Sequence, residues 1–158
     1  MKLKNLIDED FANYKKPSMF LGFPSCTFKC ERECGGEFCQ NSCLVRQPDI
    51  EVSADKIIDR YLGNFISQAV VCGGLEPFDS FEDLFLLIRS LRARTCMDDV
   101  VIYTGYYKEE VEDKLQKLKE FPNIIVKFGR FKPNEDSHWD SVLGVKLASS
   151  NQYAERIS

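Results

Sequence analysis

Five of the seven cysteines lie in the stretch FPSCTFKCERECGGEFCQNSC, residues 23–43. The residues between them are mostly charged, glycine or small and polar, and such residues cannot form a hydrophobic core. Thiolates bind soft or borderline metals, so a zinc ion and an iron–sulfur cluster are the two candidate metal centres. The spacing therefore predicts a metal centre in a cysteine loop that spans residues 24–43.

Two kinds of metal centre fit these thiols. A zinc interpretation pairs Cys26 and Cys30 with Cys39 and Cys43 as a closed site of four thiolates, which would make the protein a non-enzymatic binding module. An iron–sulfur interpretation uses three cysteines on a cluster of four irons. One iron then has no protein ligand and is free to bind a substrate.

The composition favours metal or redox chemistry over disulfides. The chain has 158 residues, enough for a single domain with its own hydrophobic core, and its seven cysteines are an odd number. No stretch resembles a secretory signal or a membrane span, so we expect a cytoplasmic protein with reduced thiols. The net charge of −4 offers no broad positive field, which argues against a nucleic-acid partner.

One local cluster of positive charge is KFGRFK, residues 127–132, where Lys127, Arg130 and Lys132 alternate with aromatic residues. We interpret it as an exposed strand end with solvated charges. A basic edge beside an anionic ligand or partner is the alternative.

The elements that must position the cysteine loop alternate along the chain. Apolar residues at helical spacing predict helices from Ser53 to Ile66, over residues 80–94 and over residues 107–120. Ser53 is a candidate N-cap, and Ser80 with Asp83 has the spacing of a capping box. Short apolar runs predict strands at residues 3–7, 19–23, 69–72, 100–104 and 123–128, and a late strand within residues 143–152.

This alternation predicts an α/β fold. We expect a partial (βα) barrel or an open curved, mostly parallel sheet of about five or six strands, with helices on the outer face. A closed eight-fold barrel usually needs about 250 residues. Ligands of parallel sheets bind at the carboxyl ends of the strands, so the cysteine loop, GGLEP, TGY and GRF are expected to meet at one edge.

The cysteine loop resembles the signature of the radical S-adenosylmethionine enzymes, in which three cysteines follow the first strand at spacings of three and two residues. Cys26 and Cys30 match the first spacing. EFCQN resembles the end of the signature, with Phe38 as the aromatic residue, Cys39 as the third ligand and Asn41 beyond it.

The departure is an insertion, because eight residues separate Cys30 from Cys39 where the signature has two. Cys34 is the alternative third ligand, but Glu33 precedes it instead of an aromatic residue. Gly35 and Gly36 would let the insertion turn back.

CGGLEPF resembles the Gly-Gly-Glu-Pro motif of the same enzymes, which holds the methionyl ammonium of the cofactor. Gly73, Gly74, Glu76 and Pro77 match it, and Leu75 is an extra residue within it. An ordinary glycine turn at the end of a strand is the alternative interpretation of this segment alone.

VVIYTGY, KFGRF and LASSNQ resemble the anaerobic ribonucleoside-triphosphate reductase activating proteins, a branch of that superfamily. The resemblance implies that Tyr103, Thr104 and Gly105 line the adenosyl side of the cofactor, although Tyr103 and Thr104 could equally be plain sheet residues. It also implies that residues 150–152 close the sheet or meet the partner.

The resemblance implies an activating enzyme that binds a [4Fe-4S] cluster and S-adenosylmethionine. It would form a 5′-deoxyadenosyl radical and generate a glycyl radical on a large ribonucleotide reductase subunit, with a small reductant protein such as a flavodoxin as electron donor. Activation of a different glycyl-radical enzyme is the alternative. No membrane partner is expected.

Overall fold

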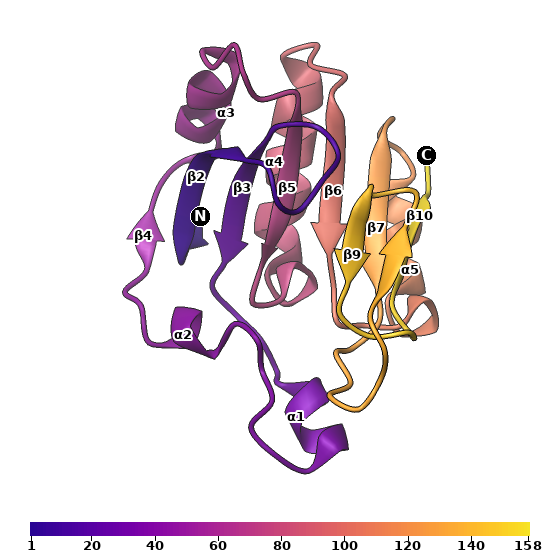
Figure 1. The fold of residues 1–158 in the computed structure, drawn as a ribbon. Helices are drawn as coiled ribbons and strands as arrows, with labels where there is room; N and C mark the ends of the chain where they lie inside the picture. Colours follow the sequence, from indigo (N-terminus) through magenta and orange to yellow (C-terminus); the bar gives the residue numbers. More distant parts are fainter.

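The computed structural model describes residues 1–158, and its centre is an open six-stranded sheet (Figure 1). The strand order is β10-β7-β6-β5-β3-β2. The inner four strands are parallel to one another, whereas the edge strands β2 and β10 pair antiparallel with β3 and β7. The strands are β2 (Asn5–Asp10), β3 (Ser18–Phe23), β5 (Ala69–Gly74), β6 (Asp99–Tyr103), β7 (Ile124–Phe128) and β10 (Tyr153–Arg156). The predicted α/β class and open, mostly parallel sheet are confirmed.

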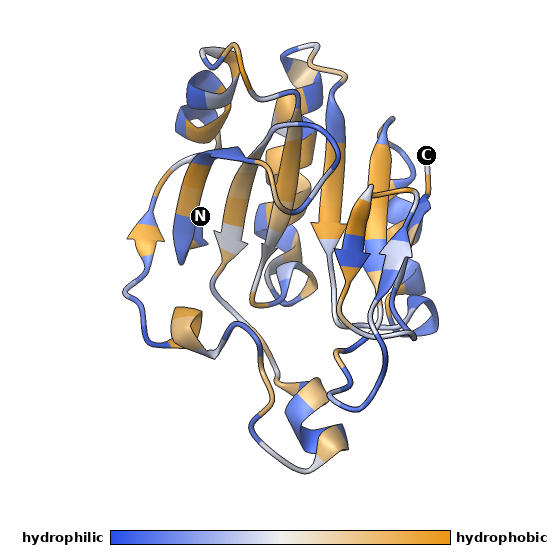
Figure 2. Cartoon of the chain, in the orientation of Figure 1, coloured by the Kyte–Doolittle hydropathy of each residue, from blue (hydrophilic) through white to orange (hydrophobic).

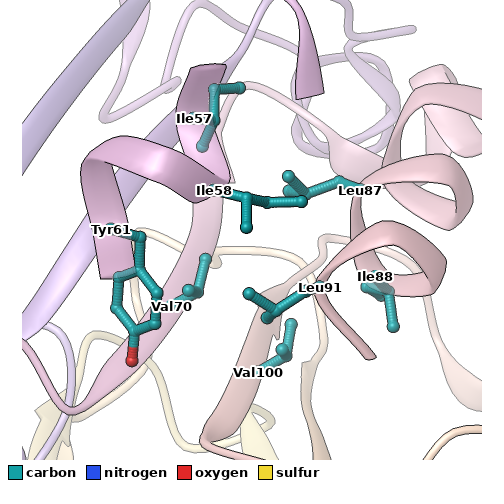
Figure 3. A pocket seen from close by; sticks show the side chains of 8 residues that line it. All are labelled: Ile57, Ile58, Tyr61, Val70, Leu87, Ile88, Leu91 and Val100. Atoms are coloured by element: carbon teal, nitrogen blue, oxygen red, sulfur yellow. The ribbon is translucent and has the colours of Figure 1, made fainter. Parts of the chain in front are cut away.

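The long helices cover one face of this sheet (Figure 1): α3 (Ala54–Leu62), α4 (Phe81–Ala93) and α5 (Glu112–Leu118). Alternate strand residues such as Val70, Val100 and Ile124 point to these helices and build a core of 24 buried residues. Figure 2 shows the resulting apolar strands at the centre of the molecule. A cavity of about 10 Å³ between α3, α4 and the sheet is a packing gap with eight hydrophobic lining residues (Figure 3).

The opposite face carries a smaller core of eight buried residues. The hairpin of β8 (His138–Asp140) and β9 (Val145–Leu147) covers it together with the segment 11–17. At the amino end of β6, Asp99 accepts hydrogen bonds from Tyr14, Lys16 and Arg156. This carboxylate therefore ties the 11–17 segment and the carboxyl-terminal strand to the sheet.

The predicted helix boundaries are right in part. Ser53 caps α3, because its hydroxyl accepts a hydrogen bond from the Lys56 N–H. The helix ends at Leu62, so Phe65 lies beyond it and is 98% exposed instead of facing the core. Ser80 makes no side-chain cap, since a 3₁₀ turn at Pro77–Ser80 leads directly into α4. The predicted helix over 107–120 is split into a 3₁₀ turn at Lys108–Glu110 and α5.

Two short helices that the sequence did not predict are α1 (Lys29–Cys34), within the cysteine loop, and α2 (Ser42–Val45), which begins at its end. After α2 the chain forms β4 (Ile50–Glu51), which pairs with β1 (Lys2–Leu3). Figure 1 shows α1 beyond the carboxyl ends of the parallel strands, where the loops after β5, β6 and β7 also lie. No helix has both the length and the apolar character that crossing a membrane requires.

Candidate metal centre

The five clustered cysteines occupy different parts of the loop. Cys26 follows β3 at a distance of three residues, Cys30 lies in the first turn of α1 and Cys34 in its last turn. Cys39 precedes α2, and Cys43 is exposed within it. All seven cysteines are free, and Cys72 and Cys96 are buried in the core as small hydrophobic residues.

A tight turn at Thr27 and Phe28 separates the first two cysteines. Phe28 has φ 52° and ψ 38°, the left-handed conformation, and α1 begins at the next residue. This turn points the Phe28 N–H at Cys26, whose Sγ lies 3.2 Å away as the acceptor. The backbone thus already donates a hydrogen bond to the first thiol.

The thiol chemistry suits a metal that carries positive charge. Burial raises the pKa of Cys26 to about 12 and also raises the pKa values of Cys30 and Cys39. The proximity of Cys39 further raises the pKa of Cys30. A bound cationic metal would offset this rise by stabilising the thiolate form, so the donor set fits iron or zinc.

The thiols do not form a site for a single ion. No group of three or more cysteine, histidine, aspartate or glutamate side chains lies close enough to hold one metal ion. The four-thiolate zinc site that the spacing left open is therefore not assembled in this structure. A cluster requires less convergence, since each thiolate binds a different iron atom.

The double-glycine segment packs directly against the strand that leads to Cys26. Gly74 has φ 86°, and a Cβ there would lie 2.6 Å from the Gly22 Cα. The Leu75 N–H donates to the Phe23 carbonyl, and the Glu76 N–H donates to the Ser25 carbonyl at 2.8 Å. Only glycine fits such a close approach of two backbones.

Glu76 is the buried acid of the site. Its carboxylate accepts hydrogen bonds from the Thr104 hydroxyl at 2.8 Å, the Gly105 N–H at 2.8 Å and the Phe78 N–H at 3.1 Å. Burial raises the pKa of Glu76 to about 7, although these hydrogen bonds act to lower it. With the extra Leu75 in place, Glu76 still lines one pocket with Cys26 and Cys30.

Arg130 lines the same pocket, and the prediction of solvated charges in KFGRFK is wrong for it. Arg130 is 3% exposed and Lys127 is 7% exposed. The Arg130 Nη2 donates to Glu110 at 2.5 Å, while its buried Nε and Nη1 have no hydrogen-bond partner. Nε lies 3.2 Å from a Glu33 oxygen, but the geometry is not that of a hydrogen bond. A buried cation with free donors can bind an anionic ligand.

The SSNQ segment holds the loop that carries Arg130. The Asn151 side chain donates to the Arg130 carbonyl at 2.9 Å, and the Gln152 side chain donates to the Gly129 carbonyl at 3.3 Å. The Lys127 ammonium donates to the same Gly129 carbonyl, which accounts for its burial at the end of β7. We expected this segment to close the sheet or meet a partner, and within the chain it fixes the loop after β7.

The other predicted cofactor residues lie at different distances from the pocket. Asn41 donates to the Gly74 carbonyl at 2.7 Å and so joins the cysteine loop to the double-glycine segment. Thr104 is buried against Glu76. Tyr103 instead points to the smaller core, where its hydroxyl donates to the Asn13 carbonyl. Gly73 lies against the Phe20 ring.

Two spaces adjoin Arg130. The pocket that holds Cys26, Cys30 and Glu76 has a volume of about 30 Å³. A groove of about 440 Å³ runs along Cys34, Phe38 and residues 130–135. Small-molecule sites usually have at least about 300 Å³, so a nucleotide cofactor would need the pocket to widen, or to be joined to the groove.

A family model described as a 4Fe-4S single cluster domain matches residues 18–153, most of the chain. No curated protein matches the chain.

Proposed function

Because this chain belongs to the family of 4Fe-4S single cluster domains, we propose that it is a radical S-adenosylmethionine enzyme with the cluster in its cysteine loop. The observation that carries the proposal is the shared pocket of Cys26, Cys30 and Glu76, with Arg130 in its wall. Thiolates for the cluster, an acid for an ammonium group and a cation for a carboxylate stand together there. These are the groups needed to hold an amino acid against an iron atom.

The proposed cluster ligands are Cys26, Cys30 and Cys39. The sulfur of Cys26 already accepts a hydrogen bond from the backbone N–H of Phe28. When bound, the cluster would supply the electron for reductive cleavage of a carbon–sulfur bond of S-adenosylmethionine, which would give methionine and a 5′-deoxyadenosyl radical able to take a hydrogen atom from the substrate. The protein's own residues would bind and orient the cofactor and keep water out of the site.

Glu76 and Arg130 are the proposed binding groups for the two charges of the methionyl part. Three hydrogen bonds fix the Glu76 carboxylate, so it can accept from an ammonium group without reorganising. Arg130 offers two free buried N–H groups, Nε and Nη1, to a carboxylate. Phe38 and the groove beside it would take the adenosyl part. Asn41, through its hydrogen bond to the Gly74 carbonyl, would hold the cysteine loop against the Gly73–Gly74 segment.

The proposed substrate is a glycine of a large anaerobic ribonucleotide reductase subunit, and the proposed electron donor is a small reductant protein. VVIYTGY, KFGRF and LASSNQ support this branch of the superfamily. The SSNQ segment also has a position consistent with it, because it holds the loop that borders the groove. A macromolecular substrate also suits a pocket too small for a second small molecule.

The test is anaerobic reconstitution with iron and sulfide, followed by electron paramagnetic resonance of the reduced protein with and without S-adenosylmethionine. We expect the cofactor to change the cluster spectrum, and Glu76→Gln to weaken that change while the iron content stays constant. Mixing with the reductase subunit should then give a glycyl-radical signal. A cluster spectrum that the cofactor leaves unchanged would contradict the proposal.

A further inference from the structure

The turn between Cys26 and Cys30 is held from outside the cysteine loop by Asp79 and Tyr106. The Thr27 N–H donates to the Asp79 Oδ2 at 2.8 Å. The Tyr106 hydroxyl donates to the Asp79 Oδ1 at 2.5 Å and lies 3.3 Å from the Thr27 hydroxyl. Since the Tyr106 hydrogen is directed at Asp79, the Thr27 hydroxyl is the donor to Tyr106.

These contacts bear on Phe28, the next residue. A phenylalanine rarely adopts the left-handed conformation, which persists only where neighbouring contacts fix it. Thr27 is fixed at three points: Asp79 binds its N–H, Tyr106 its hydroxyl and the Arg32 guanidinium its carbonyl. The result is the Phe28 N–H directed at the Cys26 Sγ.

Tyr106 is itself well anchored. Its N–H donates to the Thr104 hydroxyl, which in turn donates to Glu76, and the Lys29 ammonium lies 4.7 Å from the centre of its ring. Burial and the hydrogen bond to Asp79 raise the pKa of Tyr106 to about 12, so its hydroxyl keeps its proton. The anchor therefore links the Cys26 turn to the loops after β5 and β6.

We propose that Asp79 and Tyr106 are positioning residues, which hold the Thr27–Phe28 turn so that Cys26 meets the cluster with its sulfur hydrogen-bonded. The proposal rests on the assignment of Cys26 as a cluster ligand. Hydrogen bonds to ligand sulfurs help to set the reduction potential of iron–sulfur clusters, because they stabilise the more negative, reduced state. Asp79 and Tyr106 would thereby act on both the retention and the potential of the cluster.

The variants are Tyr106→Phe and Asp79→Ala, and the control is Tyr61→Phe. Tyr61 donates to the Asp98 carboxylate at 2.6 Å, an equivalent hydrogen bond near the amino end of β6. We expect both test variants to lose iron to a chelator at least about 10-fold faster than the parent, because substitution of residues that orient a metal ligand commonly weakens metal binding by that much. We also expect both to have a more negative cluster reduction potential. Tyr61→Phe should change neither property, although it lowers stability.

Apoprotein gives a readout without iron. Alkylation of Cys26, followed by peptide mass spectrometry, should be faster in Tyr106→Phe than in the parent, while alkylation of buried Cys72 stays slow in both. Phe28→Gly provides a rescue, since glycine adopts the left-handed conformation at little cost. Added to Tyr106→Phe, it should restore much of the iron retention.

The outcomes separate this proposal from the proposed function. If Cys26→Ala retains the cluster, the ligand assignment itself fails. If Cys26→Ala loses the cluster while Tyr106→Phe and Asp79→Ala behave like Tyr61→Phe, the ligand assignment stands and the positioning role is wrong. A loss of iron in Tyr106→Phe at an unchanged potential, with no rescue by Phe28→Gly, would also overturn it.

Discussion

Glu110 and Arg130 form a hydrogen-bonded ion pair, in which Oε1 of the acid lies 2.5 Å from Nη2 of the guanidinium. The same oxygen accepts from Lys29 at the start of α1. The Arg130 hydrogen bond is the main cause that lowers the pKa of Glu110 to about 2. One carboxylate thus joins the loop after β7 to the helix that carries Cys30.

We expect Arg130→Met to weaken binding of S-adenosylmethionine by about 10- to 100-fold, because a charge-assisted hydrogen bond contributes about 1.5–3 kcal/mol. Titration of the cofactor-induced change in the cluster spectrum measures this. Iron content should stay at the parental level, since Arg130 is not a proposed ligand. Equal affinity in parent and variant would exclude Arg130 from the cofactor site.

Single substitutions of the loop cysteines by alanine identify the third ligand. Variants at Cys26, Cys30 and Cys39 should lose most of the iron and sulfide after anaerobic reconstitution, because each removes one of three thiolates. Variants at Cys34 and Cys43 should retain them and serve as matched controls. Loss in the Cys34 variant with retention in the Cys39 variant would assign the third position to Cys34.

Gly74→Ala should destabilise the fold by about 1–3 kcal/mol, which is the cost of holding a non-glycine residue in an unfavourable backbone conformation. The close approach to Gly22 adds to this cost. Urea unfolding of the apoprotein measures it. Gly105→Ala is the comparison, because a Cβ there meets nothing closer than 3.6 Å. Similar unfolding midpoints for the two variants would show that β3 and β5 can separate at this point.

The Asp99 network predicts how stability depends on acid. Burial acts to raise the pKa of Asp99, but hydrogen bonds from Lys16, Arg156 and Tyr14 outweigh it and lower the pKa to about 2. An unfolded chain has an aspartate pKa of about 3.9, so the lower pKa in the folded protein stabilises the fold at pH values above about 3.9. This contribution of about 2 kcal/mol is lost as the pH falls through about 2. In Asp99→Asn apoprotein, the free energy of unfolding should fall less steeply between pH 4 and 2. An unchanged slope would show that Asp99 does not carry this dependence.

The sequence predicted the sheet well, because each inner strand is a short apolar run between helices with an apolar stripe. It missed β10, whose residues Tyr153–Arg156 are polar and form an exposed edge. It also missed α1, which buries no residue and so lacks the apolar periodicity that marks a helix. Phe65 was misplaced because the apolar pattern continued past the actual helix end at Leu62.

In the candidate site, the sequence identified the cysteines and Glu76 by motif, but not the groups that surround them. Arg130 was predicted to be solvated because its partner Glu110 lies in another element, and no local sequence pattern indicates such an ion pair. Asp79 and Tyr106 are likewise joined only by the fold. Two features of the sequence could have indicated a fixed loop beside Arg130: the glycine at position 129, which adopts φ 98° in the structure, and the polar SSNQ segment.

The lack of buried residues in α1 has a consequence for how the protein matures. The sheet and its helices have a complete apolar core of their own, whereas α1 and α2 together bury only Leu44. We therefore expect the sheet to fold without iron, so that the thiols of the loop stand on an already folded chain. The cluster would then be assembled after folding.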